Sequence, residues 1–293
     1  MPTYETPKPI FVTMDLAVGD IRIVAGERAT TVVEVRPSDP AQDADVRAAE
    51  QARVEYSAGR LLIKVAKQRA RGLFGRAGSI DVTLELPAGS ELEAVASMAT
   101  VRSTGRLGQA RIKVSAGDVQ LDQTGAVDLE TGAGLVVVNL VAGDATVTSG
   151  TGKIRLREIE GGAVVKNADG DNWIGEIRGA LRVRTANGDI AVDRAHADLT
   201  AATANGDVQI GEVIRGVTSL KTANGQIRVG IRAGSAARLD VHTSYGRVQN
   251  HLQGVEAPAA SDQRVEVRAQ TSYGDIVVHR SSVSEPANSK ELK

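Results

Sequence analysis

A short alternation of apolar and polar positions recurs through most of the chain and indicates two strands per repeat. It is centred on a glycine, with apolar residues two and four positions after it and another five positions before it. Around Gly152 these residues are Ile154, Leu156 and Val147. A period of two residues is the pattern of a half-buried β-strand. Each repeat therefore predicts two short strands separated by a tight turn at the glycine.

The turn glycines recur at nearly constant spacing. The first six intervals are 17 to 19 residues long, and the last two are 21 and 28. The nine glycines are Gly117, Gly134, Gly152, Gly170, Gly188, Gly206, Gly225, Gly246 and Gly274. A degenerate copy without its glycine lies at Ser97–Arg102, and an isolated relative begins at Gly19. A fixed period of this length is typical of a repeat architecture.

Two architectures fit this repeat. An Asn-Gly turn between alternating strands, as at Asn187-Gly188, is a strong hairpin signal and would give a meander or a propeller. In a β-solenoid the turn is instead a corner, and each coil stacks on the preceding one. Stacking places equivalent residues about 4.8 Å apart and favours identical neighbours, such as the Thr or Ser that recurs three positions before the glycine. The solenoid is therefore favoured, with its handedness and number of faces left open.

The first part of the chain follows a different pattern. The Ala-rich segment Asp39–Ala52 predicts a short helix, Arg53–Lys67 a hairpin around Ser57-Ala58-Gly59, and Ser79–Leu86 a strand. We therefore predict an all-β, single-stranded β-helix (β-solenoid) with coils of about 18 residues over 97–280. A small α+β segment over 1–96 would cap it, because an open coil end exposes unpaired backbone groups. Residues 281–293 are expected to be a disordered tail.

Composition argues against several functional classes. Aromatic residues make up only 2% of the 293 residues, too few for the walls of an ordinary enzyme pocket, and the absence of cysteine excludes disulfides and thiolate metal sites. A net charge of −1 gives no general attraction to nucleic acid. The chain contains no G-x-S-x-G, H-E-x-x-H or P-loop motif. We expect a protein that is not an enzyme and has no cofactor.

The sequence also bears on location. Met1–Ile10 lacks the apolar core of a signal peptide. The longest apolar run, Leu135–Ala142, is interrupted by Asn139 and is too short to cross a bilayer. We therefore expect no membrane span and a cytoplasmic protein, associated with a membrane only through a partner.

The segment SIDVTLELPAGSELEAV (Ser79–Val95), followed by units such as TANGDIAV (Thr185–Val192) and TSYGDIVV (Thr271–Val278), resembles a bacterial family of β-strand-repeat proteins of unknown function. Its members are labelled putative adhesins and are also called toastrack domains. The resemblance covers roughly residues 10 to 280. It implies a β-helical fold and a scaffold or envelope-stress-sensing role, and it provides no catalytic residues.

The repeat itself suggests one candidate metal site. Asp171, Asp189 and Asp207 each follow a corner glycine and would stack into an acidic column. A Ca²⁺ ion would relieve their repulsion. The simpler interpretation, which we prefer, is that each carboxylate is solvated or bonds its own turn. His251 and His279 form a second pair of possible neighbours, without an evident third ligand.

Candidate interaction residues lie where the repeat is broken. The basic loop Lys67–Gly78 carries Arg69, Arg71 and Arg76 around Leu73 and Phe74, and an aromatic side chain flanked by arginines is a common protein-binding anchor. The alternative is that Leu73 and Phe74 plug the solenoid end. Trp173 occupies an outward position and is a second candidate. Tyr245 and Tyr273 replace Asn at two corners and are expected to stack.

These features predict an interaction scaffold that binds another protein. The alternative is a glycan-binding or carbohydrate-active β-helix, which would gather acidic and aromatic residues in one groove. Self-association through the coil ends is a further hypothesis.

Overall fold

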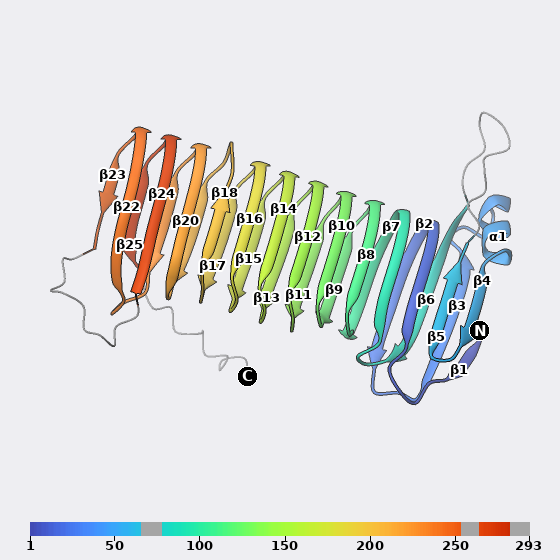
Figure 1. The fold of residues 1–293 in the computed structure, drawn as a ribbon. Coiled ribbons are helices and arrows are strands. Elements are labelled where there is room, and N and C mark those ends of the chain that lie inside the picture. The colour runs from blue at the N-terminus through green and yellow to red at the C-terminus, as the bar shows by residue number, and fades with distance from the viewer. Residues whose placement is uncertain (66–77, 253–263, 282–293) are drawn as a thin grey trace, which may run out of the picture. The chain divides into compact units, whose positions relative to one another are not determined.

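A computed structural model describes residues 1–65, 78–252 and 264–281. They belong to two compact units, Met1–Trp173 and Ile174–Lys293. Within each unit the strands lie side by side in a regular series (Figure 1). The described residues contain a single α-helix, α1 (Asp43–Glu50), so the predicted all-β class is confirmed.

In the first unit the repeats form parallel coils with two strands each. One row consists of β8 (Ala110–Ala116), β10 (Val127–Ala133), β12 (Ala145–Thr151) and β14 (Ala163–Asp169). The second consists of β9 (Val119–Thr124), β11 (Val136–Val141) and β13 (Ile154–Ile159). Parallel pairing between coils confirms the solenoid and excludes the hairpin meander. Inward residues such as Val138 and Val147 are fully buried, so the core lies between the rows.

The stacked coils begin earlier than the periodic glycines. β2 (Phe11–Gly26) and β7 (Glu91–Arg106) are long strands that pair in parallel from Phe11 with Glu91 to Ala25 with Gly105. β7 then pairs with β8 and β9. In this register Gly19 lies beside Ala99, which occupies the corner of the degenerate copy.

Antiparallel strands and the helix complete the N-terminal part of the first unit. β3 (Thr30–Pro37) pairs antiparallel with β6 (Ser79–Pro87) and with β1 (Thr3–Glu5). β4 (Arg53–Ser57) and β5 (Arg60–Lys64) form a hairpin whose turn residues Ala58 and Gly59 have φ of 49° and 78°. The predicted helix, hairpin and strand of this segment are therefore confirmed, whereas the proposed domain boundaries stay a prediction.

The second unit continues the same design. One row contains β16 (Leu181–Asn187), β18 (Leu199–Ala202) and β20 (Gly216–Asn224). The other contains β17 (Ile190–Ala195), β19 (Val208–Val213) and β21 (Ile227–Ile231). β15 (Asn172–Ile177) spans the boundary of the units.

The last two coils stack in inverted order. β24 (Arg264–Tyr273) lies between β20 and β22 (Ala236–Tyr245), and β25 (Ile276–Arg280) lies between β21 and β23 (Val248–Asn250). Figure 1 shows β24 inserted in this way. The expectation that each coil stacks on the one before it in sequence is therefore wrong for these two coils.

The polarity of the inward side chains explains why β24 and β25 lie inside β22 and β23. The inserted coil points Val267 and Val278 into the core, both fully buried. The corresponding residues of the outer coil are Leu239 and Asn250, and a polar Asn is less costly at the solvent end than inside. The Arg280 guanidinium donates hydrogen bonds to the carbonyl oxygens of Arg232 (3.0 Å) and Ser235 (2.8 Å), which fasten the segment that leads from β21 to β22.

The corner glycines hold the coils at close range. Gly152 has φ of 139°, and a Cβ on it would lie 2.0 Å from the carbonyl oxygen of Gly134 in the preceding coil. At several corners, the threonine three residues before the glycine donates its hydroxyl to a glycine carbonyl of the neighbouring coil. In the second unit such bonds run from Thr222 to Gly206 (2.9 Å), Thr271 to Gly225 (3.0 Å) and Thr243 to Gly274 (2.9 Å).

Replacing a corner glycine should strongly destabilise the first unit. For Gly152→Ala we expect a loss of about 3 kcal/mol in the free energy of unfolding, because the methyl group meets a backbone oxygen and the φ is strained for an L-residue. Urea denaturation measures the change. Gly26→Ala is the matched control, since no atom lies within 4 Å of its Cβ, and it should change stability by less than about 0.5 kcal/mol. Equal effects of the two substitutions would contradict the close-approach argument.

The inverted coil order is testable by cross-linking, because the chain has no cysteine of its own. Ser219 of β20 is the register partner of Arg268. Ser219→Cys combined with Arg268→Cys should therefore form a disulfide under mild oxidation, since adjacent strands bring the Cα atoms within bonding range. Ser219→Cys with Asp240→Cys should stay reduced. Efficient cross-linking of the second pair would show that the coils follow sequence order.

Candidate functional site

The structure leaves the predicted basic anchor untested. Arg69, Arg71, Leu73, Phe74 and Arg76 all lie outside the described residues. Trp173 is the second residue of β15 and is partly buried. Its role in binding stays a prediction.

The acidic column fastens neighbouring corners. Asp189 Oδ1 accepts a hydrogen bond from the backbone N–H of Asp207 (2.8 Å), and Asp207 Oδ1 accepts one from Gln226 (2.7 Å). In the first unit Asp171 forms an ion pair with Lys153 at 3.1 Å. Asp189 and Asp207 are both exposed and each also bonds the next coil, a contact that the sequence did not predict. Within the described ranges, no group of three or more acidic or histidine side chains is placed to hold a metal ion.

Two predicted pairs come together at the end of the second unit. The rings of Tyr245 and Tyr273 stack with centroids 4.8 Å apart and an interplanar angle of 9°, which confirms the expected stack. Both side chains are more than half exposed. His251 directly follows β23, and its N–H donates to the carbonyl of Val278 (2.8 Å), so it lies beside His279.

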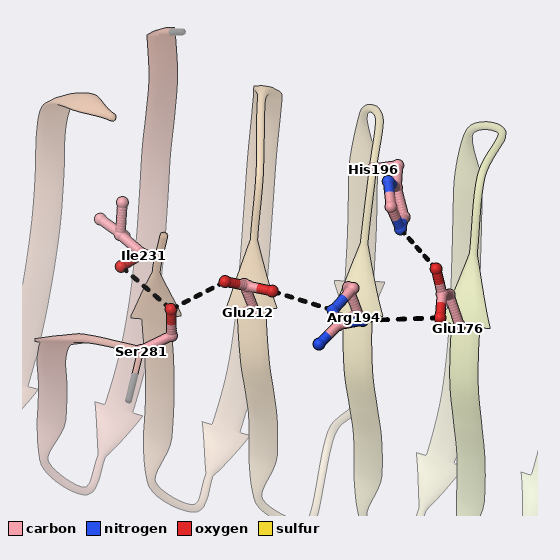
Figure 2. Close-up of polar contacts among 6 residues, drawn as sticks. All are labelled: Glu176, Arg194, His196, Glu212, Ile231 and Ser281. Atoms are coloured by element: carbon pink, nitrogen blue, oxygen red, sulfur yellow. Dashed lines mark hydrogen bonds and ion pairs between the residues drawn. The ribbon is translucent and has the colours of Figure 1, made fainter. Parts of the chain in front are cut away.

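A chain of polar contacts crosses several coils of the second unit (Figure 2). His196 Nε2 lies 2.8 Å from Glu176 Oε1, and Arg194 lies 3.7 Å from Glu176 and 2.9 Å from Glu212. The Ser281 hydroxyl donates to Glu212 (3.0 Å) and lies 3.5 Å from the Ile231 carbonyl oxygen. The chain thus joins a hydroxyl, two carboxylates and an imidazole.

The Ser281 hydroxyl and the His196 imidazole do not contact each other, so they do not form a nucleophile–base pair. A guanidinium keeps its proton at any physiological pH. Arg194 lies between the two carboxylates and separates Ser281 from His196. The alternating signs of Glu176, Arg194 and Glu212 instead let equivalent positions of stacked coils lie side by side without repulsion. We therefore interpret this chain as a stabilising charge ladder.

A hollow lies on the surface of the first unit. Two adjoining cavities of about 240 and 460 Å³ lie over β3, β6, β2 and β7 and share Asp20 and Asp81. The smaller is also lined by Arg22, Glu34, Arg36 and Arg102. We refer to these six residues as the charged hollow. The larger cavity is also lined by Ala99, which replaces the corner glycine in the degenerate copy Ser97–Arg102.

Like charges are neighbours in the charged hollow. Arg22 is the register partner of Arg102, and Asp20 is the register partner of Asp81. Arg36 pairs with Glu34, and Asp81 accepts a 2.6 Å hydrogen bond from Ser38. Neither the Arg22 nor the Arg102 side chain forms an ion pair or hydrogen bond with any residue that the structure describes. Like charges directly opposite one another are unfavourable; Asp81 also lies opposite Arg36 of β3, whereas Arg22 and Arg102 have no acidic register partner.

Some other outward charges of the first unit are paired across coils. Lys113 contacts Glu130 at 2.8 Å, and Arg111 contacts Asp128 at 3.4 Å. The charged hollow was not predicted, because its strands are far apart in sequence. A signal was present, since aligning Gly19-Asp20-Ile21 with the degenerate copy places Arg22 beside Arg102.

A family model described as Toastrack DUF4097 matches residues 12–282. Among solved structures, the chain is similar to a putative adhesin from Bacteroides fragilis, with 12% identity, a TM-score of 0.42 and coverage of 94% of this chain and 95% of that one. It is also similar to a putative adhesin from Parabacteroides merdae, with 12% identity, a TM-score of 0.32 and coverage of 95% and 94%. A third is a putative lipid binding protein from Parabacteroides distasonis, with 12% identity, a TM-score of 0.31 and 96% coverage of both chains.

No curated protein matches the chain. Among the described residues, no helix has the length and apolar character needed to cross a membrane.

The charge ladder should contribute modestly to stability. Arg194→Ala leaves Glu212, whose side chain is only 15% exposed, without its cationic partner. We expect a loss of about 1 kcal/mol in the free energy of unfolding, measured by thermal or urea denaturation at low salt. Arg184→Ala removes an exposed guanidinium that pairs with no described residue, and it should be nearly neutral. If both substitutions have the same effect, the ladder has no stabilising role.

Proposed function

The chain belongs to the Toastrack DUF4097 family, and we propose that it is a non-catalytic interaction scaffold. In this proposal the first unit binds carboxylate side chains of a protein partner in the charged hollow. The stacked coils supply a rigid support, because each outward side chain is fixed by the register of its strand. Binding surfaces built on such elements are more precise than those on loops.

The observation that carries the proposal is the pair Arg22 and Arg102. Their Cα atoms are register partners on neighbouring strands, which places them about 4.8 Å apart. A carboxylate accepts bidentate hydrogen bonds from one guanidinium, and a second arginine on the adjacent strand adds to the attraction for the same anion. A carboxylate from a partner would remove the repulsion between the two cations.

The acidic half of the charged hollow defines the partner further. Asp20 and Asp81 lie in the row next to Arg22 and would repel a continuous polyanion such as nucleic acid. A protein surface can instead present a carboxylate and a basic group side by side. Electrostatic complementarity of this kind gives specificity and fast association.

The glycan-binding alternative is less well supported. The residues that line the charged hollow include acidic groups, but none of the described ones is aromatic. Trp173 lies on β15, and the two stacked tyrosines belong to the second unit. The acidic and aromatic residues are thus scattered rather than gathered in one groove.

Several finer expectations remain predictions. These are the cytoplasmic location, the link to envelope stress that the resemblance implies, and a second anchor at the basic loop around Phe74. The proposal for the charged hollow depends on none of them.

A fluorescent peptide of alternating Glu and Lys residues tests the proposed specificity, because it presents carboxylates with basic groups beside them. We expect binding at low salt, and at least a tenfold weaker affinity for the double variant Arg22→Ala, Arg102→Ala, as measured by fluorescence anisotropy. Arg155→Ala, Arg157→Ala on β13 is the matched control. It removes the same charge from an exposed part of the same unit and should bind like the unaltered chain.

Equal loss of affinity in the two double variants would refute a specific site and leave only the effect of net charge. No measurable binding by the unaltered chain at low salt would refute the carboxylate site altogether.

A further inference from the structure

The second unit ends in an open coil. β22 and β23 pair with β24 and β25 on one side, and no described residue pairs with their other side. The backbone N–H and C=O groups along these outer edges therefore lack strand partners within the described part of the chain. An exposed edge strand is a ready template for pairing with another chain.

The inward side chains of this coil are also incompletely covered. Leu239 and Val241 are only half-buried, whereas Val267 in the adjacent coil is fully buried. Val248 on β23 is 44% exposed, and Tyr245 at the corner is 66% exposed. Further strands stacked on this end would bury apolar surface as well as satisfy the backbone.

The charges on β22 favour a particular partner. Arg238 and Asp240 point to the same outward face of β22. Across the pairing with β24, Arg238 lies opposite Glu266 and Asp240 lies opposite Arg268. When two copies of β22 pair antiparallel with Leu239 on the two-fold axis, each Arg238 lies opposite the Asp240 of the other copy. Arg238 and Asp240 then each have an opposite charge on β24 and another on the second copy. Ala237 of one copy lies opposite Val241 of the other.

Neighbouring registers are unfavourable. Centring the pair on Arg238 or on Asp240 would place two identical charges opposite each other. A shift by a single residue would turn the apolar face outward. Among these registers, the one centred on Leu239 alone places opposite charges against each other, and its two-fold symmetry is the condition for a closed, isologous dimer.

We propose that two copies of this chain associate through the β22 edges of their second units, in the antiparallel register that pairs Arg238 with Asp240. The dimer continues the row of β22 across the two-fold axis and covers Leu239 and Val241. This inference is independent of the charged hollow, which lies in the first unit.

A charge-complementation experiment with the full chain tests this register. Asp240→Arg and Arg238→Asp each place like charges opposite each other in a homodimer, so each variant alone should have a dissociation constant at least tenfold higher than that of the unaltered chain. An equimolar mixture of the two variants restores both opposite-charge pairs and should recover the dimer. Sedimentation velocity over a concentration series measures each state, and circular dichroism checks that the variants fold.

The control is Arg182→Asp on β16, which makes the same charge change as Arg238→Asp at another exposed site of the second unit. Its homodimer should be unaffected, and its mixture with Asp240→Arg should not recover the tight association expected of the two complementary variants. Failure of those variants to associate when mixed would overturn the proposal. So would a monomeric unaltered chain, including one that dimerises only after deletion of residues 282–293, because the tail would then be the occupant of the edge.

Discussion

The close approach of successive corners is the contact on which the coils of both units depend. A corner glycine leaves no room for a side chain, because the carbonyl oxygen of the neighbouring corner occupies the place where a Cβ would be. This contact fixes the register of the two strands that flank it, and in the second unit threonine hydroxyls bond the same carbonyl groups. Strand pairing, the division into inward and outward positions, and the stacked Asn187, Asn205 and Asn224 side chains all follow from that register.

Fixed register has a consequence for the surface. Equivalent positions of stacked coils are direct neighbours, so a repeated charge would meet its own kind unless the sequence alternates signs. Glu176, Arg194 and Glu212 alternate and form a continuous ladder (Figure 2). The charged hollow departs from this arrangement, because Arg22 lies beside Arg102 and Asp20 beside Asp81. The repulsion between Arg22 and Arg102 would be relieved by a bound carboxylate, as proposed above.

The periodic glycines were sufficient to predict the coils, because each needs a conformation and a spacing that other residues do not allow. The helix and hairpin before β6 were also predictable from local composition and turn residues. The order of the last two coils was not, because both contain Thr-Ser-Tyr-Gly at the corner and only the polarity of Asn250 against Val278 separates them. The charged hollow was missed because β2 and β7 meet through a pairing of high sequence separation.

The inverted order of the final coils also affects the timing of biosynthesis. A chain emerges from the ribosome in sequence order, and N-terminal parts fold first. β22 and β23 are synthesised before β24 and β25, yet they belong on the far side of them. The place beside β20 and β21 must therefore stay open, or be vacated, until β24 and β25 have been made. The first unit can form before these strands are synthesised, whereas the second reaches its final strand order only after them.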